Sequence, residues 1–249
     1  MDRLYLIDRI EFRPDTETIS TRLRLGELAG ALNLEGLLSQ AARIAMPRAA
    51  WALFEPAPAG KRQVVIAGER LTSRILRVNL RNAGRVALFV ATCGPELEQW
   101  SEGFDDPLER WVTDEICEEA LRSAVVALEA ALDNEIEGEY RVSMNPGSLE
   151  DWPLVEQGPL FRALALAGDV TRATGVELTE SFLMTPRKSL SGVRFASPRQ
   201  FTNCMLCPRD DCAGRRMAYD PKEFERQYDG AVRGTLYAET CGCGHDAAG

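Results

Sequence analysis

The chain has 249 residues, of which 45% are hydrophobic and 27% are charged, and this composition excludes extensive disorder and fits one large domain or one domain with an appendix. Its formal net charge of -9 excludes the basic surface that binding to nucleic acid or to an anionic membrane requires. The first residues lack a signal-peptide pattern, and no apolar run approaches the ~18 residues that span a bilayer, so we expect a cytoplasmic protein.

The N-terminal part of the chain predicts strands and helices in alternation. Residues 3–12 are expected to include a first strand, and Asp15 is expected to cap the short helix after it. Helical spacing of apolar residues from 27 to 45 predicts a second helix. The apolar run 86–92 predicts a buried strand, and Pro95 fits the first turn of the helix that follows.

The longest helix signal begins at Asp106, an N-cap residue followed by proline, and continues to about Glu137. Its apolar residues form one continuous stripe, and Gly138 suits its C-terminal end. We expect this helix to support the loop that follows it.

Two stretches after the long helix place polar residues around turns. The first is Arg141-Val-Ser-Met-Asn-Pro-Gly147, in which a fixed cation precedes a Pro-Gly turn. The second is L-T-E-S-F-L-M-T-P-R-K-S-L-S-G, from Leu178 to Gly192, with acceptor-rich residues on either side of a turn at Pro186. Within it, the apolar run 182–184 predicts a strand end that enters a core.

These stretches resemble the activation, or reactivation, domain of cobalamin-dependent methionine synthase. The match is to the pattern L-T-E-S-F-x-M-x-P-x-x-S-x-S-G preceded by an arginine and a Pro-Gly turn, over roughly residues 140–196. The resemblance implies an α+β fold, with helices around a twisted, mostly antiparallel sheet. It also implies that the domain binds S-adenosylmethionine and offers its methyl group to a cobalt that has been oxidised.

S-adenosylmethionine carries a carboxylate, an ammonium and a sulfonium group, so its site needs a fixed cation, a carboxylate and a loop that allows close approach. The resemblance and these needs assign the ligand contacts to Arg141, Pro146, Gly147, Glu180 and Ser181. The family spaces the arginine and Pro-Gly two residues closer and has an aromatic residue where this chain has Ser148, a role for which Tyr140 and Trp152 are candidates. The alternatives are a surface salt bridge for Arg141 and a hydrogen-bonded carboxylate that holds a strand for Glu180.

Five of the seven cysteines lie after Phe201, where the composition changes abruptly. We therefore predict a ligand-binding domain over 1–200 and a metal-binding extension over 201–249. The candidate metal ligands are Cys204, Cys207, Cys212, Cys241 and Cys243. This spacing suits an iron–sulfur cluster or zinc, with free thiols as a third alternative, and we favour the cluster because reactivation needs one low-potential electron. Cys93 and Cys117 are isolated and are expected to be core residues.

The sequence thus predicts a stand-alone protein that binds S-adenosylmethionine and reductively remethylates the cob(II)alamin of a partner methyltransferase, with methionine synthase as the expected partner. The cobalamin is expected on the partner, and the electron from a donor such as flavodoxin or ferredoxin. No catalytic proton-transfer residue is expected, because methyl transfer to cobalt(I) needs chiefly proximity. The alternatives are an iron–sulfur redox activator without a methyl-donor role and an adaptor ordered by zinc.

Overall fold

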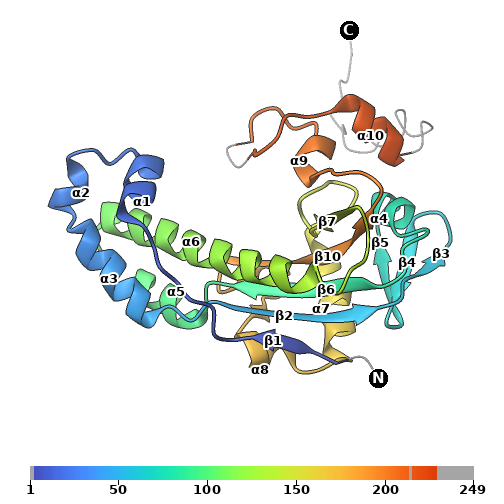
Figure 1. Cartoon of the computed structure of the whole chain (residues 1–249), viewed down its shortest axis with the longest axis horizontal. Coiled ribbons are helices and arrows are strands. Elements are labelled where there is room, and N and C mark those ends of the chain that lie inside the picture. The colour runs from blue at the N-terminus through green and yellow to red at the C-terminus, as the bar shows by residue number, and fades with distance from the viewer. Residues whose placement is uncertain (1–2, 213–214, 229–249) are drawn as a thin grey trace, which may run out of the picture.

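The computed structural model describes residues 3–212 and 215–228, and its centre is a five-stranded sheet (Figure 1). The strands lie in the order β1-β2-β6-β10-β7, and each neighbouring pair is antiparallel. Their bounds are Tyr5–Ile7 for β1, Arg48–Phe54 for β2, Val86–Thr92 for β6, Tyr140–Met144 for β7 and Ser189–Ser197 for β10. The predicted α+β class with a mostly antiparallel sheet is confirmed.

The central strands are buried on both faces, because helices cover both sides of the sheet. Trp51 and the other odd-numbered residues of β2 pack in one core with the longest helix, whereas Phe54 and the even-numbered residues pack in the opposite core. All seven residues of β6 are buried. The burial of both faces explains why β6 has an uninterrupted apolar sequence rather than an alternating one.

The longest helix, α6 (Pro107–Leu132), lies across one face of the sheet (Figure 1). The Asp106 carboxylate accepts hydrogen bonds from the backbone N–H groups of Leu108 and Glu109, so the predicted N-cap is confirmed. The predicted end at Glu137 is wrong, because the chain turns where the N–H groups of 135 and 136 both bond to the Leu132 carbonyl. No described helix, α6 included, combines the length and the apolarity that crossing a bilayer requires.

Four shorter helices pack near the N-terminal end of α6 (Figure 1). They are α1 (Thr16–Leu23), α2 (Leu28–Ala31), α3 (Leu34–Ile44) and α5 (Pro95–Glu102). Asp15 caps α1 and Pro95 begins α5, as predicted. The single helix predicted over 27–45 is wrong, because Asn33 has φ 48° and separates α2 from α3.

The opposite face of the sheet is covered mainly by α7 and α8, and a smaller three-stranded sheet with α4 lies at one end (Figure 1). The bounds are α4 Arg74–Asn79, η1 Leu154–Glu156, α7 Gln157–Ala165 and α8 Val170–Thr174. The smaller sheet contains β3 (Ala57–Ala59), β4 (Gln63–Ile66) and β5 (Glu69–Thr72), and a two-stranded ribbon contains β8 (Glu177–Leu178) and β9 (Met184–Thr185).

The chain after residue 200 forms α9 (Asn203–Leu206) and α10 (Pro221–Tyr228), and it packs on the core of the preceding residues. Phe201 is 3% exposed and its ring centre lies 6.4 Å from that of Phe195. Leu206 and Tyr228 are also buried in this core. The described part of the extension therefore shares one hydrophobic core with the sheet. The division at residue 200 stays a prediction, since 229–249 lie outside the described residues.

Candidate ligand site

The turn after β7 holds two of the predicted ligand residues, Pro146 and Gly147. The Gly147 N–H donates to the Trp152 carbonyl at 2.7 Å, and the Ser148 N–H donates to the Asn145 carbonyl at 3.2 Å. Gly147 has φ 83°, a left-handed value that glycine adopts without strain. Pro146 is buried, whereas Gly147 and Ser148 are exposed. The turn is closed at its base and presents its backbone at its tip.

The base of this turn is anchored in the core by Asp151 and Trp152. The Asp151 carboxylate accepts hydrogen bonds from the Ser73 hydroxyl at 2.8 Å and from the Ile75 N–H at 3.0 Å, which ties the turn to the start of α4. Trp152 is fully buried. Trp152 therefore does not stand beside Ser148 at the tip, and of the two aromatic candidates only Tyr140, at the start of β7, is partly exposed.

A hydrogen bond joins the two sequence stretches that form the motif. Asn145 Nδ2 donates to the Ser191 carbonyl of β10 at 2.7 Å. Beside it, Gly192 has no room for a side chain, since a Cβ there would lie 2.4 Å from the Met144 carbonyl oxygen and 2.6 Å from Asn145 Nδ2. The glycine that ends the motif thus allows the turn after β7 to pack directly against β10.

The serines of the second stretch stabilise the fold around the site. The Ser189 hydroxyl donates to the Pro186 carbonyl at 2.7 Å and lies 2.9 Å from the Thr92 hydroxyl. The Ser191 hydroxyl donates to Gln157 Oε1 at 2.8 Å. These bonds hold the first half of β10 against β6 and α7.

Arg141 lies at the start of β7, and its guanidinium meets the C-terminal end of α6. Its Nε donates to the Ile136 carbonyl at 3.0 Å, and its Nη2 donates to the Asp133 carbonyl at 3.1 Å. The Asp133 carbonyl, at the C-cap of α6, lies at the negative end of the helix dipole and therefore attracts this cation. The side chain is 30% exposed, which leaves part of the guanidinium open to a ligand.

A second arginine, Arg194 of β10, pairs with Ser143 of β7 and lies on the same sheet face as Arg141. Its Nη1 donates to Glu129 Oε1 at 2.8 Å and to Ser143 Oγ at 3.2 Å, and its Nη2 donates to Asp133 Oδ1 at 3.0 Å. The side chain is 8% exposed, and Nε is buried without a partner among the described residues. Arg194 is not among the ligand contacts predicted from the sequence. The spacing of Glu129 and Asp133, four residues apart on one helix face, was the only available signal.

We call these residues the arginine cluster: Glu129, Asp133, Arg141, Ser143 and Arg194. The cluster presents two guanidinium groups and two carboxylates at one end of the sheet. Guanidinium groups bind carboxylates bidentately and carboxylates accept hydrogen bonds from ammonium groups, so the set matches a zwitterion. An open depression of about 280 Å³ lies where β2 ends and β6 begins, at the same end of the sheet. Its lining includes Leu53, Phe54, Glu55, Ala67 and Arg85.

The other two predicted ligand residues, Glu180 and Ser181, lie in the turn between β8 and β9. The Thr179 N–H donates to the Leu183 carbonyl at 2.8 Å, and the hydroxyls of Thr179 and Ser181 lie 3.0 Å apart. Glu180 is exposed. Leu183 is 54% exposed, whereas Met184 begins β9 and packs against the core, so the prediction that 182–184 is a strand end entering a core is confirmed for Met184 and wrong for Leu183.

The structure places this turn and Arg141 in different parts of the fold. The turn leads into Ser189 at the start of β10, whereas Arg141 pairs with Ala196 near the end of that strand. The seven residue-to-residue steps from 189 to 196 span about 23 Å of strand. No hydrogen bond or ion pair joins Arg141 and Glu180 in the described structure. The five predicted contacts therefore fall into two groups, with 141, 146 and 147 on one strand and its turn, and 180 and 181 on another turn.

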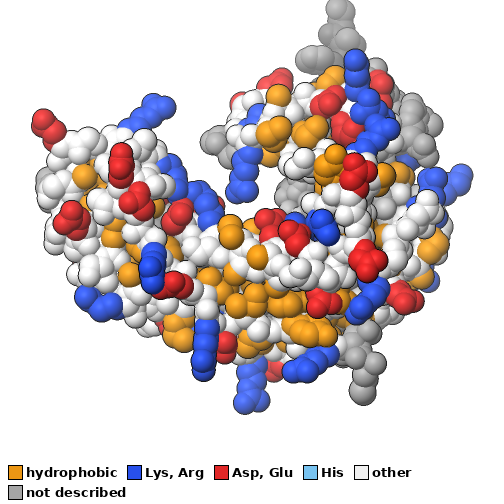
Figure 2. Space-filling model, in the orientation of Figure 1, with side chains coloured by type: hydrophobic (Ala, Val, Ile, Leu, Met, Phe, Trp, Pro, Cys, Tyr) orange, Lys and Arg blue, Asp and Glu red, His pale blue; other side chains and the backbone are white. Residues whose placement is uncertain are grey.

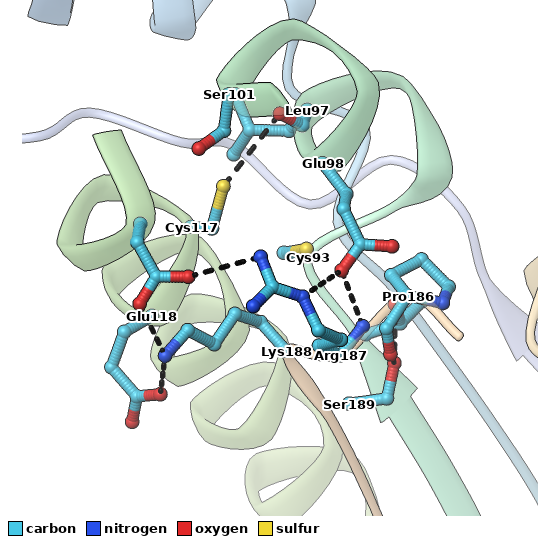
Figure 3. A network of polar contacts seen from close by, with 12 residues as sticks. Cys93, Leu97, Glu98, Ser101, Cys117, Glu118, Pro186, Arg187, Lys188 and Ser189 are labelled. Atoms are coloured by element: carbon cyan, nitrogen blue, oxygen red, sulfur yellow. Dashed lines mark hydrogen bonds and ion pairs between the residues drawn. The ribbon is translucent and has the colours of Figure 1, made fainter. Parts of the chain in front are cut away.

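The bend at Pro186, between β9 and β10, is held by acidic residues of α5 and α6 (Figure 3). Lys188 Nζ lies 2.9 Å from Asp114 and 3.7 Å from Glu118, and the Arg187 N–H donates to the Glu98 carboxylate. Partial burial acts to lower the pKa of Lys188. The hydrogen bond with Asp114 and the nearby negative charges outweigh the burial, and the pKa is raised above its usual 10.5.

We expect the contacts of Lys188 to add stability that is lost at alkaline pH. Because its pKa is higher in the folded state, the folded state holds this proton more tightly than the unfolded state does. The contribution is complete below the usual pKa of 10.5 and falls as the pH rises through the raised value. Unfolding midpoints of wild type and Lys188→Met should differ by a constant amount near neutrality and converge above pH 10.5. A difference that persists unchanged in alkaline solution would contradict this.

Two of the described cysteines in the extension, Cys204 and Cys207, contact an arginine through their backbone carbonyls. Arg215 donates to the backbone carbonyls of Cys204 and Cys207, each at 3.2 Å, and also to the Arg209 carbonyl. Within 3–212 and 215–228, no group of three or more His, Cys, Asp or Glu side chains could hold a metal ion. The predicted metal set stays a prediction, because Cys241 and Cys243 lie outside the described residues. Cys93 and Cys117 are buried core residues, as predicted.

Comparisons with known proteins support the fold. No family model matches the chain, and no curated protein matches it in sequence. Among solved structures, the chain is similar to one described as the crystal structure of the MetH reactivation domain bound to AdoHcy, at 17% identity and a TM-score of 0.58. The similarity covers 91% of this chain and 89% of the other, far more than the stretch 140–196. The predicted likeness to the reactivation domain is thus confirmed for the fold.

Proposed function

We propose that this protein binds S-adenosylmethionine and takes part in the reactivation of a cobalamin-dependent methyltransferase, with methionine synthase as the expected partner. The observation that carries the proposal is the fold shared with a reactivation domain whose structure is described as bound to AdoHcy. The hydrogen bond from Asn145 to Ser191 adds support, because it unites the two stretches on which the sequence resemblance depends.

The arginine cluster fits the amino-acid end of S-adenosylmethionine. The Nε of Arg194 is buried and has no partner among the described residues, so a ligand carboxylate would satisfy it once the side chains that cover it move aside. Asp133 and Glu129 are 49% and 44% exposed, so either can accept a hydrogen bond from the ligand ammonium. We therefore add Arg194 and Asp133 to the proposed contacts of Arg141 and of the turn at Pro146 and Gly147.

Glu180 and Ser181 are proposed to contact the ligand or the partner separately from the arginine cluster. Their turn lies before the start of β10, so a contact with the same ligand requires that the ligand or the partner reaches that end of the strand. Exposed carboxylate and hydroxyl groups on a closed turn suit such a contact.

The proposed reaction requires no proton transfer by a side chain of this protein. S-adenosylmethionine supplies an activated methyl group to the reduced cobalt of the corrinoid that the partner carries. The cluster and the turn have to hold the donor in one orientation beside the partner, which is catalysis by proximity. The electron is proposed to come from an external donor such as flavodoxin or ferredoxin.

The second candidate function is an iron–sulfur redox activator. The close sequence spacing of Cys204, Cys207 and Cys212 favours it, although the described cysteines do not form a metal site by themselves. Metal analysis and visible spectra of anaerobically purified protein separate the two candidates. A chromophore that bleaches on reduction, together with no affinity for S-adenosylmethionine, would support the redox activator alone.

Calorimetric titration tests the proposed ligand. We expect S-adenosylmethionine and S-adenosylhomocysteine to bind with one-to-one stoichiometry. Arg141→Ala should weaken both at least tenfold, because a hydrogen bond to a charged group contributes about 1.5–3 kcal/mol. Arg13→Ala is the control, since Arg13 is 81% exposed and its ion pair is with the nearby Glu11. Absence of binding by the wild-type protein would overturn the proposal.

A further inference from the structure

Within the described part of the extension, the side chain of Asn203 is hydrogen-bonded to the turn after β7. Asn203 Nδ2 donates to Asn145 Oδ1 at 2.9 Å, and Asn145 Nδ2 donates to the Ser191 carbonyl at 2.7 Å. Two hydrogen bonds thus connect α9 to β10 through the residue that precedes Pro146. This connection lies outside the residues that the sequence resemblance assigns to the ligand.

We propose that Asn203 is a positioning residue for the turn after β7, so that the C-terminal extension completes the ligand site. The inference rests on the proposed function, since the turn is its proposed ligand-binding loop. Asn203 acts through Asn145 and does not itself need to touch the ligand.

The chemistry of the amide group explains how Asn203 positions the turn. The carboxamide of Asn145 has a donor end and an acceptor end, and a single orientation satisfies both Ser191 and Asn203. Without the donor from Asn203, Asn145 keeps only one bond and its side chain is free to rotate. Because Asn145 also accepts the Ser148 N–H on its backbone carbonyl, a loosened Asn145 loosens the tip at Gly147 and Ser148.

Stability alone does not account for an asparagine at position 203. Its Oδ1 is buried without a partner among the described residues, and a buried acceptor without a partner is unfavourable. An apolar residue would avoid that cost. The contact with Asn145 supplies a reason for the amide, and it predicts that removing the amide affects ligand binding more than folding.

The short helix that carries Asn203 is itself held firmly. Leu206 is fully buried, and Phe201 packs beside Phe195 of β10. Arg215 binds the carbonyls of Cys204 and Cys207 at the two ends of the helical turn. Asn203 therefore projects from a fixed support, as a positioning residue must.

The test compares Asn203→Ala with Thr202→Ala in the full-length chain. Thr202 is exposed and its side chain makes no capping bond, so it is a matched control on the same segment. We expect Asn203→Ala to weaken S-adenosylmethionine binding about five- to tenfold, the effect of one hydrogen bond, with the unfolding midpoint close to that of the control. A double-mutant cycle with Asn145→Ala should show coupling, because both variants remove the same bond.

Amide hydrogen exchange without ligand gives an independent readout. The N–H groups of Gly147 and Ser148 should exchange faster in Asn203→Ala than in Thr202→Ala. Unchanged exchange and affinity in Asn203→Ala, or additive effects in the cycle, would overturn the positioning role. If the wild type binds no S-adenosylmethionine, the proposed function fails. The exchange experiment still decides whether Asn203 holds the turn.

Discussion

Gly192→Ala is expected to destabilise the protein by about 3 kcal/mol, at the upper end of what overpacking costs. The new Cβ would lie 2.4 Å from the Met144 carbonyl oxygen, and real Cβ atoms essentially never come within 3.0 Å of another group. This contact is with backbone, so no side-chain rotation relieves it. β7 would have to move away from β10, and the Asn145–Ser191 bond would break with it.

Thermal or denaturant unfolding measures this effect, with Gly84→Ala as the control. A Cβ at Gly84 meets no atom within 4 Å, and the residue does not have a left-handed φ, so that substitution should be neutral or slightly stabilising. S-adenosylmethionine binding should fall sharply in Gly192→Ala even at a temperature where the variant is folded. Equal stabilities of the two variants would show that β7 and the turn after it do not pack on β10 as described.

The parts of the fold that the sequence predicts correctly are those with local signals. Asp15 and Asp106 indicate helix starts, because the side chain of an N-cap residue accepts hydrogen bonds from N–H groups two or three residues later in the sequence. The strand 86–92 is recognisable because both of its faces are buried and every residue is apolar or small. Helix breaks are less visible. The apolar spacing of 27–45 continues through Asn33 as it would inside a helix. The left-handed φ of Asn33 nevertheless separates α2 from α3.

Only part of the candidate site comes from contiguous stretches of sequence, and this limits how much of it the sequence can predict. The Pro146-Gly147 turn and the Ser-Leu-Ser-Gly stretch are contiguous patterns, and the structure brings them together. The arginine cluster draws on α6, β7 and β10, and strand register alone decides that Arg194 lies beside Ser143. Register and helix placement depend on packing across the whole sheet. Local patterns therefore suggested Glu180 as the carboxylate that binds the same ligand as Arg141, whereas the carboxylate beside Arg141 is that of Asp133.

The arginine cluster leads to the second large expected effect, which is that of Arg194→Ala. The substitution removes hydrogen bonds to Glu129, Ser143 and Asp133 from a side chain that is 8% exposed. Breaking a fully buried ion pair costs about 3–5 kcal/mol. Here both carboxylates are nearly half exposed and water can solvate them, so we expect a loss of about 2 kcal/mol in stability. S-adenosylmethionine affinity should fall at least tenfold, since the guanidinium is proposed to bind the ligand carboxylate.

Two further variants act as controls. One tests whether the charge of Arg194 suffices without its planar shape, and the other measures the effect of losing an exposed ion pair. Arg194→Lys keeps the positive charge but loses the planar fork, so stability should recover in part while affinity stays low. Arg162→Ala removes a 2.8 Å ion pair to Glu69 from a side chain that is 61% exposed, and it should change stability by less than about 1 kcal/mol. If Arg194→Ala binds S-adenosylmethionine as tightly as Arg162→Ala does, the ligand does not use the cluster. The site would then lie at the Pro146-Gly147 turn and the Glu180 turn alone, because those are the proposed contacts that do not depend on the end of α6.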